Sequence, residues 1–120
     1  MKLHDLIPAF ILSATTAFAD APEVVDVTAS KSGDGWRFNV TIAHGDTGWD
    51  DYADGWEVID ADGTPLGTRP LAHPHVNEQP FTRSQSGIVI PEGTTEVFIR
   101  VRDNVQGWYD IRFPYALPKS

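Results

Sequence analysis

Apolar and polar residues alternate strictly along residues 36–42, WRFNVTI, and this pattern constrains the fold more than any other feature of the chain. Successive side chains of a β-strand point to opposite faces, so the apolar residues of this segment would share one face. Further segments carry strand composition or the same alternation and end at turn residues: 23–30, 55–60, 65–71, 81–90, 96–102 and 108–115. No stretch shows a sustained helical period. The chain is therefore predicted to be all-β.

Turn residues separate the expected strands and indicate how they connect. Asp62-Gly63 is a strong signal of a tight hairpin, and Pro91-Glu92-Gly93 closes the segment that precedes residue 96. About seven short strands in roughly a hundred residues are typical of an immunoglobulin-like or fibronectin-type β-sandwich. A chain of this length can bury one core, so residues 20–120 are predicted to form a single domain of this kind.

Residues 1–19 have the pattern of an export signal. Lys2 gives a weakly positive start, the apolar run 6–12 follows, and the segment 17–19 (AFA) fits the small-x-small pattern before a cleavage site at Asp20. We therefore expect a signal peptide and a periplasmic or secreted domain. A transmembrane helix needs about 20 apolar residues, so no membrane span is expected in the mature chain. The alternative, an N-terminal core helix, is disfavoured because no amphipathic pattern follows.

Charge and composition exclude several classes of function. The formal net charge of −8 argues against binding to nucleic acid or anionic membranes, and it is compatible with cationic partners such as metal ions. The chain has no cysteine, and its single methionine, Met1, would leave with the signal, which excludes thiolate chemistry and a thioether copper(I) site. It contains neither a Gly-x-Ser-x-Gly motif nor a glycine-rich phosphate loop. The domain is therefore predicted to be non-enzymatic, with no catalytic residues.

Strand counting brings the histidines of the mature chain to one end of the predicted sandwich. If consecutive strands run antiparallel, their connections alternate between the two ends. The longer loops then share one end: 44–54, 72–79 and 103–107. His44, His73 and His75 all fall in these loops, whereas the opposite end carries only short turns. Sandwich folds commonly carry function in loops grouped in this way.

The segment His73-Pro74-His75 suggests a metal site. Two imidazoles two residues apart in a non-helical stretch have a spacing that metal sites use, and imidazole is the commonest protein ligand of zinc and copper. With His44 as a third nitrogen donor, the set suits Zn²⁺ or Cu²⁺. Acidic residues of the same loops would supply a fourth ligand or orient an imidazole: Asp46, Asp51 and Glu78. The alternative is that these are surface histidines whose rings bond to backbone carbonyls.

Two further interpretations of the same loops stay open. The aspartates of loop 44–54 offer the oxygen ligands that Ca²⁺ prefers, although their spacing does not match an EF-hand and aspartate is also a common loop residue. Trp49, Tyr52 and Trp108 would otherwise form a surface for a carbohydrate or a periplasmic protein partner, since aromatic side chains combine contact area with a polar group. The domain would then be a metal-independent adaptor. Loop aromatics more often cap the core.

Several segments of the chain resemble a group of small exported bacterial β-sandwich proteins: 47–54 (TGWDDYAD), 56–58 (WEV), 67–69 (GTR) and 73–84 (HPHVNEQPFTRS). The resemblance covers most of the mature chain, and residues 73–84 are its most specific part. It implies the immunoglobulin-like sandwich fold and export, and no particular chemistry. In that group a histidine often stands where this chain has Asp51, so the resemblance implies one potential metal ligand fewer here.

Overall fold

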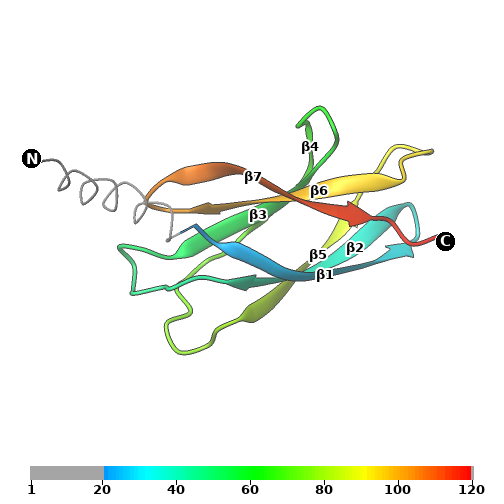
Figure 1. Cartoon of the computed structure of the whole chain (residues 1–120). Coiled ribbons are helices and arrows are strands. Elements are labelled where there is room, and N and C mark those ends of the chain that lie inside the picture. Colours follow the sequence, from blue (N-terminus) through cyan, green and yellow to red (C-terminus); the bar gives the residue numbers. More distant parts are fainter. Residues whose placement is uncertain (1–20, 120) are drawn as a thin grey trace, which may run out of the picture.

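The structure is a computed structural model that describes residues 21–119, and these residues form seven β-strands (Figure 1). The strands are β1 (Glu23–Ser32), β2 (Gly35–Ala43), β3 (Ala53–Ile59), β4 (Pro65–Pro70), β5 (Phe81–Ile88), β6 (Glu96–Asp103) and β7 (Gly107–Ala116). The predicted all-β class is confirmed, and each strand lies close to the segment expected for it. The predicted signal peptide, residues 1–19, lies outside the described residues. Between residues 21 and 119, no helix has the length and apolar character that crossing a membrane requires.

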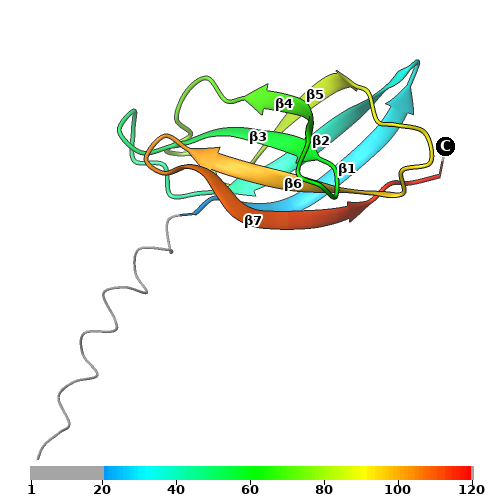
Figure 2. The ribbon, with the colours of Figure 1, turned by 90° about the horizontal axis from the view of Figure 1, so that it is seen from above.

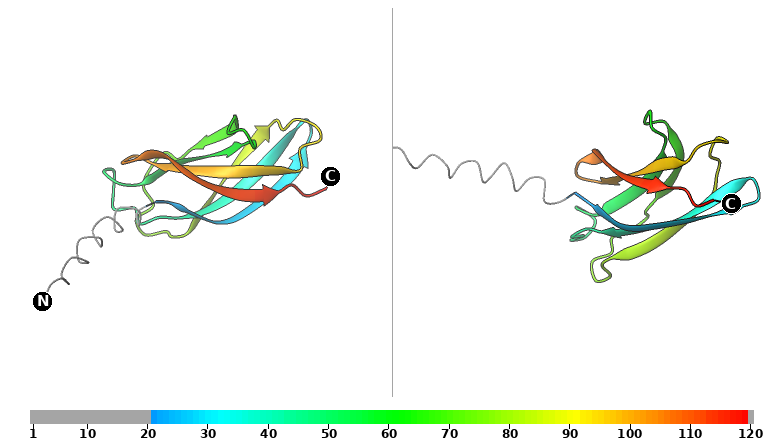
Figure 3. Two further views of the ribbon diagram at one scale, coloured as in Figure 1. Left: turned by 45° about the horizontal axis from the view of Figure 1, so that its top comes forward. Right: turned by 45° about the vertical axis from the view of Figure 1, so that its right-hand side comes forward.

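The strands form two antiparallel sheets that pack face to face as a sandwich (Figure 3). One sheet has the order β1-β2-β5 and the other has the order β4-β3-β6-β7. In a constant-type immunoglobulin domain the fourth strand joins the sheet of the fifth. Here β4 pairs with β3 instead, so the sheet of β3, β6 and β7 has four strands and the sheet of β1, β2 and β5 has three. Seen from above, β4 lies near β5 at one side of the sandwich, and β7 lies near β1 at the other (Figure 2).

The core lies between the two sheets and is built by the alternation read from the sequence. All apolar side chains of the 36–42 segment are buried, and those at 38, 40 and 42 are almost completely buried. They belong to one cluster with buried residues of the facing sheet, namely Trp56, Val58, Val97, Ile99 and Val101. The shared apolar face predicted for residues 36–42 is thus confirmed.

Gly67 of β4 allows the two sheets to approach closely at one edge. A Cβ atom at this position would lie 2.6 Å from Cγ1 of Ile88, the last residue of β5. This distance is far inside van der Waals contact, so any side chain here would have to displace the isoleucine. Glycine within a strand commonly marks such a close approach.

The β2–β3, β4–β5 and β6–β7 loops lie at one end of the sandwich, on the left in Figure 1, as the strand count predicts. Hydrogen bonds join them directly. The backbone N–H of Asn104 donates to the carbonyl oxygen of Tyr52 at 3.2 Å, which links the β6–β7 and β2–β3 loops. The backbone N–H of His44 donates to Oε1 of Gln79 at 2.9 Å, which links the β2–β3 and β4–β5 loops. The scaffold therefore holds the three loops against one another.

Candidate metal centre

His44 follows directly after β2, and only 1% of its side-chain surface is exposed. Its Nδ1 lies 2.6 Å from Oδ1 of Asp46. An ionised carboxylate only accepts hydrogen bonds, so Nδ1 carries the proton and donates it. When the ring is neutral, Nε2 then has a free lone pair on the side away from Asp46. Carboxylates hold metal-binding histidines in this way, fixing both the tautomer and the orientation of the ring.

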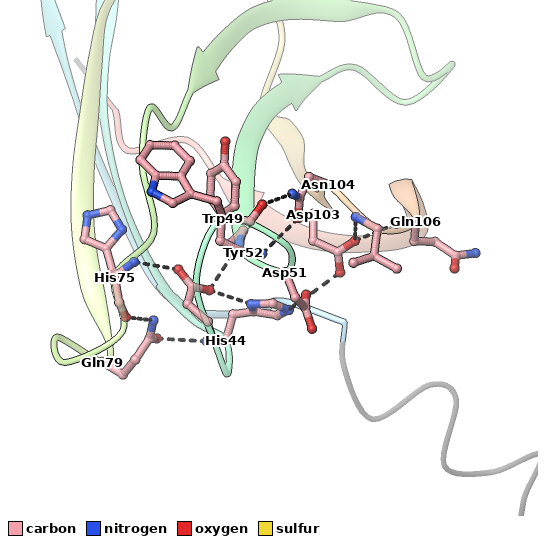
Figure 4. A network of polar contacts seen from close by, with 12 residues as sticks. His44, Trp49, Asp51, Tyr52, His75, Gln79, Asp103, Asn104 and Gln106 are labelled. Carbon is pink, nitrogen blue, oxygen red and sulfur yellow. Dashed lines mark hydrogen bonds and ion pairs between the residues drawn. The ribbon is translucent and has the colours of Figure 1, made fainter.

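Asp46 is itself held by backbone groups from two further segments. Its Oδ1 also accepts a hydrogen bond from the N–H of Ala53 at 3.1 Å, and its Oδ2 accepts one from the N–H of His75 at 2.8 Å. No part of the Asp46 side chain is exposed. One buried carboxylate thus joins the start of β3, the β4–β5 loop and the ring of His44 (Figure 4).

Nε2 of His44 faces two carboxylate oxygens. It lies 3.8 Å from Oδ1 of Asp51 and 3.6 Å from Oδ2 of Asp103, and the three side chains converge in Figure 4. Both distances are too long for hydrogen bonds. They are close to the separation of two ligand atoms on one tetrahedral zinc ion, about 3.4 Å for metal–ligand bonds of about 2.1 Å. All three ligand atoms lie within 4.8 Å of one another, so this buried group can hold a metal ion.

Asp103, the last residue of β6, is firmly anchored. Its Oδ1 accepts hydrogen bonds from the backbone N–H groups of Val105 at 3.1 Å and Gln106 at 2.7 Å. Its Oδ2 accepts a hydrogen bond from the hydroxyl of Tyr109 at 2.7 Å. A carboxylate oxygen has two lone pairs, so Oδ2 keeps one for a cation beside His44. The side chain is 1% exposed, so the carboxylate has little freedom to move.

The centre collects negative charge around His44 without a lysine or arginine among residues 21–119 to balance it. Among the ion pairs of residues 21–119, no lysine or arginine pairs with Asp46, Asp51 or Asp103. Burying a charged carboxylate costs on the order of several kcal/mol unless it is paired or hydrogen-bonded. Nε2 of His44 and Oδ1 of Asp51 are in addition buried without a hydrogen-bond partner. A cation between the facing acceptor atoms would satisfy both.

The structure brings the predicted metal residues together only in part. His44 and Asp51 belong to the group that can hold a metal, and Asp46 has the orienting role predicted as one of its alternatives. His73, His75 and Glu78 do not belong to that group. Its third member is Asp103, which was not among the predicted ligands.

His75 is engaged in packing and hydrogen bonding. Its ring stacks on Phe81 with the centroids 3.9 Å apart and an interplanar angle of 10°, and the ring of His73 lies 4.8 Å away. Nη2 of Arg83 donates to Nε2 of His75 at 2.7 Å, because a guanidinium can only donate. This bond occupies the lone pair that a metal would need. Burial lowers the pKa of His75, and the neighbouring charges of Arg83 and His73 lower it further, which favours the neutral ring.

The remaining candidate residues lie at the surface. His73 is exposed, and its Nδ1 lies 3.2 Å from the carbonyl oxygen of Pro74, which fits the alternative of a surface histidine. Oε1 of Glu78 lies 3.5 Å from Nη2 of Arg83, and the Glu78 side chain is 61% exposed. This is a solvated ion pair of little energetic value.

The predicted aromatic residues make different contacts. Trp49 is 66% exposed and meets Tyr52 edge-on, with the ring centroids 5.6 Å apart. Trp108 lies instead under two guanidinium groups, those of Arg100 at 4.9 Å and Arg102 at 5.5 Å from its ring. Trp49 also borders an open groove of about 620 Å³ whose other wall is the segment 73–78.

Two residues of the centre were missed at the sequence level, and only one had a readable signal. Asp103 continues the inward alternation of Val97, Ile99 and Val101. An acidic residue at such a core position is the signal that could have identified it. Gln79 joins two loops, since its Nε2 donates to the carbonyl oxygen of His75 at 2.9 Å while its Oε1 accepts from His44. Nothing in the sequence pattern distinguishes this glutamine from an ordinary loop residue.

Comparison with known proteins gives one informative match. The chain is 48% identical over 86 residues to a protein of Halomicrobium mukohataei named "Putative lipoprotein". The alignment covers 71% of this chain and 42% of the relative, so the chain spans about two fifths of the length of the curated relative it matches. No family model matches the chain, and no solved structure matches it. The group resemblance drawn from residues 73–84 therefore stays a prediction.

Proposed function

We propose that this domain is an exported, non-enzymatic module that binds one divalent transition metal ion through His44, Asp51 and Asp103. The observation that carries the proposal is the position of the buried, unpartnered Nε2 of His44 opposite two carboxylate oxygens at 3.6 and 3.8 Å. Export is supported by the signal pattern of residues 1–19 and by the name of the similar protein, a lipoprotein. A periplasmic location is part of the same proposal.

Zn²⁺ is the favoured ion. One imidazole and two carboxylates match the nitrogen and oxygen donors that zinc accepts, and their spacing suits a tetrahedral ion. Cu²⁺ prefers a square-planar or tetragonal arrangement, although it binds most nitrogen and oxygen sites more tightly. Three protein ligands leave one position for water or an outside donor. The neighbouring polar groups of Asp46 and Tyr109 already bond to the ligands, so they position these ligands and are not free to act as a general base.

Calorimetric titration of the purified, metal-free protein with Zn²⁺ and with Cu²⁺ tests the proposal. We expect one site of micromolar or tighter affinity. The variant Asp103→Asn should lose most of this affinity, because an amide oxygen is a weaker, uncharged ligand. Asp50→Asn is the matched control, since Asp50 is exposed, lies next to the proposed ligand Asp51 and loses the same charge. Equal binding by both variants, or no binding by the parent protein, would contradict the proposal.

Nuclear magnetic resonance of His44 separates metal binding from a simple ion pair. If the ring were protonated, it would pair with the surrounding carboxylates and need no metal. The shifts of the His44 ring should then respond to pH and not to one equivalent of Zn²⁺. Under the metal proposal, one equivalent of Zn²⁺ shifts the resonances of the ring at constant pH.

A second candidate function is a metal-independent interaction at Trp49. The favouring observation is an indole that stays 66% exposed although its backbone is fixed, with its carbonyl oxygen accepting a hydrogen bond from Nδ2 of Asn104 at 2.8 Å. A fixed aromatic beside a groove whose lining includes Asn77 and Glu78 is suited to a carbohydrate or a protein side chain. Glycan screening of the parent protein and Trp49→Ala, both in the presence of a chelator, tests this alternative.

A further inference from the structure

We infer that the metal held at this centre is exchangeable, and that Asp51 is the ligand through which it enters and leaves. The inference rests on the proposed function and concerns how the same site is used. It comes from a difference in how the three ligand side chains are held. Two of them are buried and fixed by hydrogen bonds, whereas the third is partly exposed and has no side-chain hydrogen bond.

His44 and Asp103 are the anchored ligands. The ring of His44 is fixed by Asp46, which is in turn held by two backbone N–H groups. The carboxylate of Asp103 accepts three hydrogen bonds, two from backbone N–H groups and one from a hydroxyl. Both side chains are 1% exposed, so neither can turn away from the centre without breaking buried hydrogen bonds.

Asp51 has no comparable support for its side chain. Its Oδ1 is buried at the centre without a hydrogen-bond partner, and 28% of its side chain is exposed. Its backbone is nevertheless well placed, since its N–H donates to the carbonyl oxygen of Gly48 at 3.2 Å and its carbonyl oxygen accepts from Thr47 at 3.0 Å. Rotation of the Asp51 carboxylate toward solvent would therefore break no hydrogen bond of the side chain and leave the loop in place.

The difference in exposure among the three ligands also determines the side from which an outside donor approaches the ion. Because the side chains of His44 and Asp103 are 1% exposed and that of Asp51 is 28% exposed, an incoming donor would reach the ion from the Asp51 side. A nitrogen or oxygen donor from outside would bind the open position first and then replace Asp51, while the two anchored ligands remain. This order is typical of a site that passes its ion to an acceptor. A structural zinc site is closed by four protein ligands instead.

Stopped-flow measurement of Zn²⁺ release to a chromogenic chelator tests the inference. In the parent protein, the rate of release should rise with chelator concentration, because the chelator takes part in displacing Asp51. Asp51→Asn and Asp51→Ala should still bind Zn²⁺, but at least about 10-fold more weakly and with a correspondingly faster release, since losing a ligand costs no less than losing an outer-shell partner. Asp50→Ala, in the adjacent exposed position, should release the ion at the parent rate.

The outcomes separate this inference from the proposed function. If the parent protein binds no Zn²⁺, the proposed function fails, and the inference fails with it. If the parent binds but both Asp51 variants release the ion at the parent rate, only the inference is overturned. The same holds if the Asp51 variants lose binding as completely as His44→Ala does, since Asp51 would then be an anchor.

Discussion

The backbone N–H of His75 donates a hydrogen bond of 2.8 Å to Oδ2 of Asp46, and through it the His-Pro-His segment supports the candidate centre. The imidazole of His75 takes no part in this contact. The segment therefore contributes its main chain to the orientation of His44, while its rings pack on Phe81 and each other. The His-Pro-His segment suggests metal ligands in the sequence. In the structure it instead helps to support another proposed ligand, His44.

Replacing Asp46 by asparagine should weaken metal binding although Asp46 is not a ligand. An asparagine side chain has one acceptor oxygen, whereas Asp46 accepts three hydrogen bonds with its two oxygens. The amide nitrogen of the asparagine would face one of these hydrogen-bond donors and could not accept from it. Either the bond to the ring of His44 or a bond to a backbone N–H group would then be lost. We expect the dissociation constant for Zn²⁺ to rise about 10- to 100-fold. Calorimetric titration measures it, and an affinity equal to that of Asp50→Asn would show that Asp46 does not orient the ligand.

The sequence was sufficient to predict the fold and the end of the sandwich that carries the centre, because both depend on local patterns. Strand alternation and turn residues act over a few positions, and the number of strands then determines on which side each loop lies. The ligand set depends instead on which side chains of the β2–β3 loop and the end of β6 meet. The N–H of His75, the carboxylate of Asp46 and the end of β6 come together only in the folded chain. Spacing along the chain therefore pointed to the histidine pair, while burial and geometry point to Asp103.

His75 should make the stability of the domain depend on pH below neutrality. Burial lowers the pKa of His75, and Arg83 beside it has the same effect. Between the unfolded pKa of about 6.5 and the lower folded value, the unfolded chain binds a proton at His75 that the folded chain does not. The stability contributed by His75 is thus present above about pH 6.5 and is lost as the pH falls toward the folded pKa.

Thermal unfolding followed by circular dichroism at pH 7.5 and pH 5 tests the role of His75. His75→Gln keeps an acceptor for Arg83 without a titrating ring, so its midpoint should fall less between the two pH values than that of the parent. His73→Gln removes a neighbouring charge that lowers the pKa of His75, so its midpoint should fall less than that of the parent and more than that of His75→Gln. An identical pH dependence in the parent and His75→Gln would show that other groups are responsible.

Gly67→Ala should destabilise the domain by about 1–3 kcal/mol, the usual cost of overpacking a close contact. The added Cβ would lie 2.6 Å from Cγ1 of Ile88, and the isoleucine is a buried core residue with little room to move. Gly45→Ala is the matched control, because a Cβ at Gly45 meets nothing within 4 Å and the residue has no positive φ. Urea unfolding of both variants measures the difference. Equal stability would mean that the edge between β4 and β5 is more open than described.

Binding of Zn²⁺ should stabilise the folded domain by an amount set by its concentration. The three ligand atoms come from the β2–β3 loop and the end of β6, so the complete site exists only in the folded chain. At a free ion concentration about 100 times the dissociation constant, the gain is about 2.7 kcal/mol, provided that the unfolded chain does not bind the ion. For a domain of this size the gain corresponds to a rise of about 10 to 20 °C in the unfolding midpoint, since about 1 kcal/mol raises it by about 4–8 °C.

Differential scanning calorimetry with Zn²⁺ and then with excess chelator measures the rise and its reversal. Asp103→Asn should show no comparable rise, whereas Asp50→Asn should behave like the parent. A rise of equal size in Asp103→Asn would place the bound ion elsewhere on the protein.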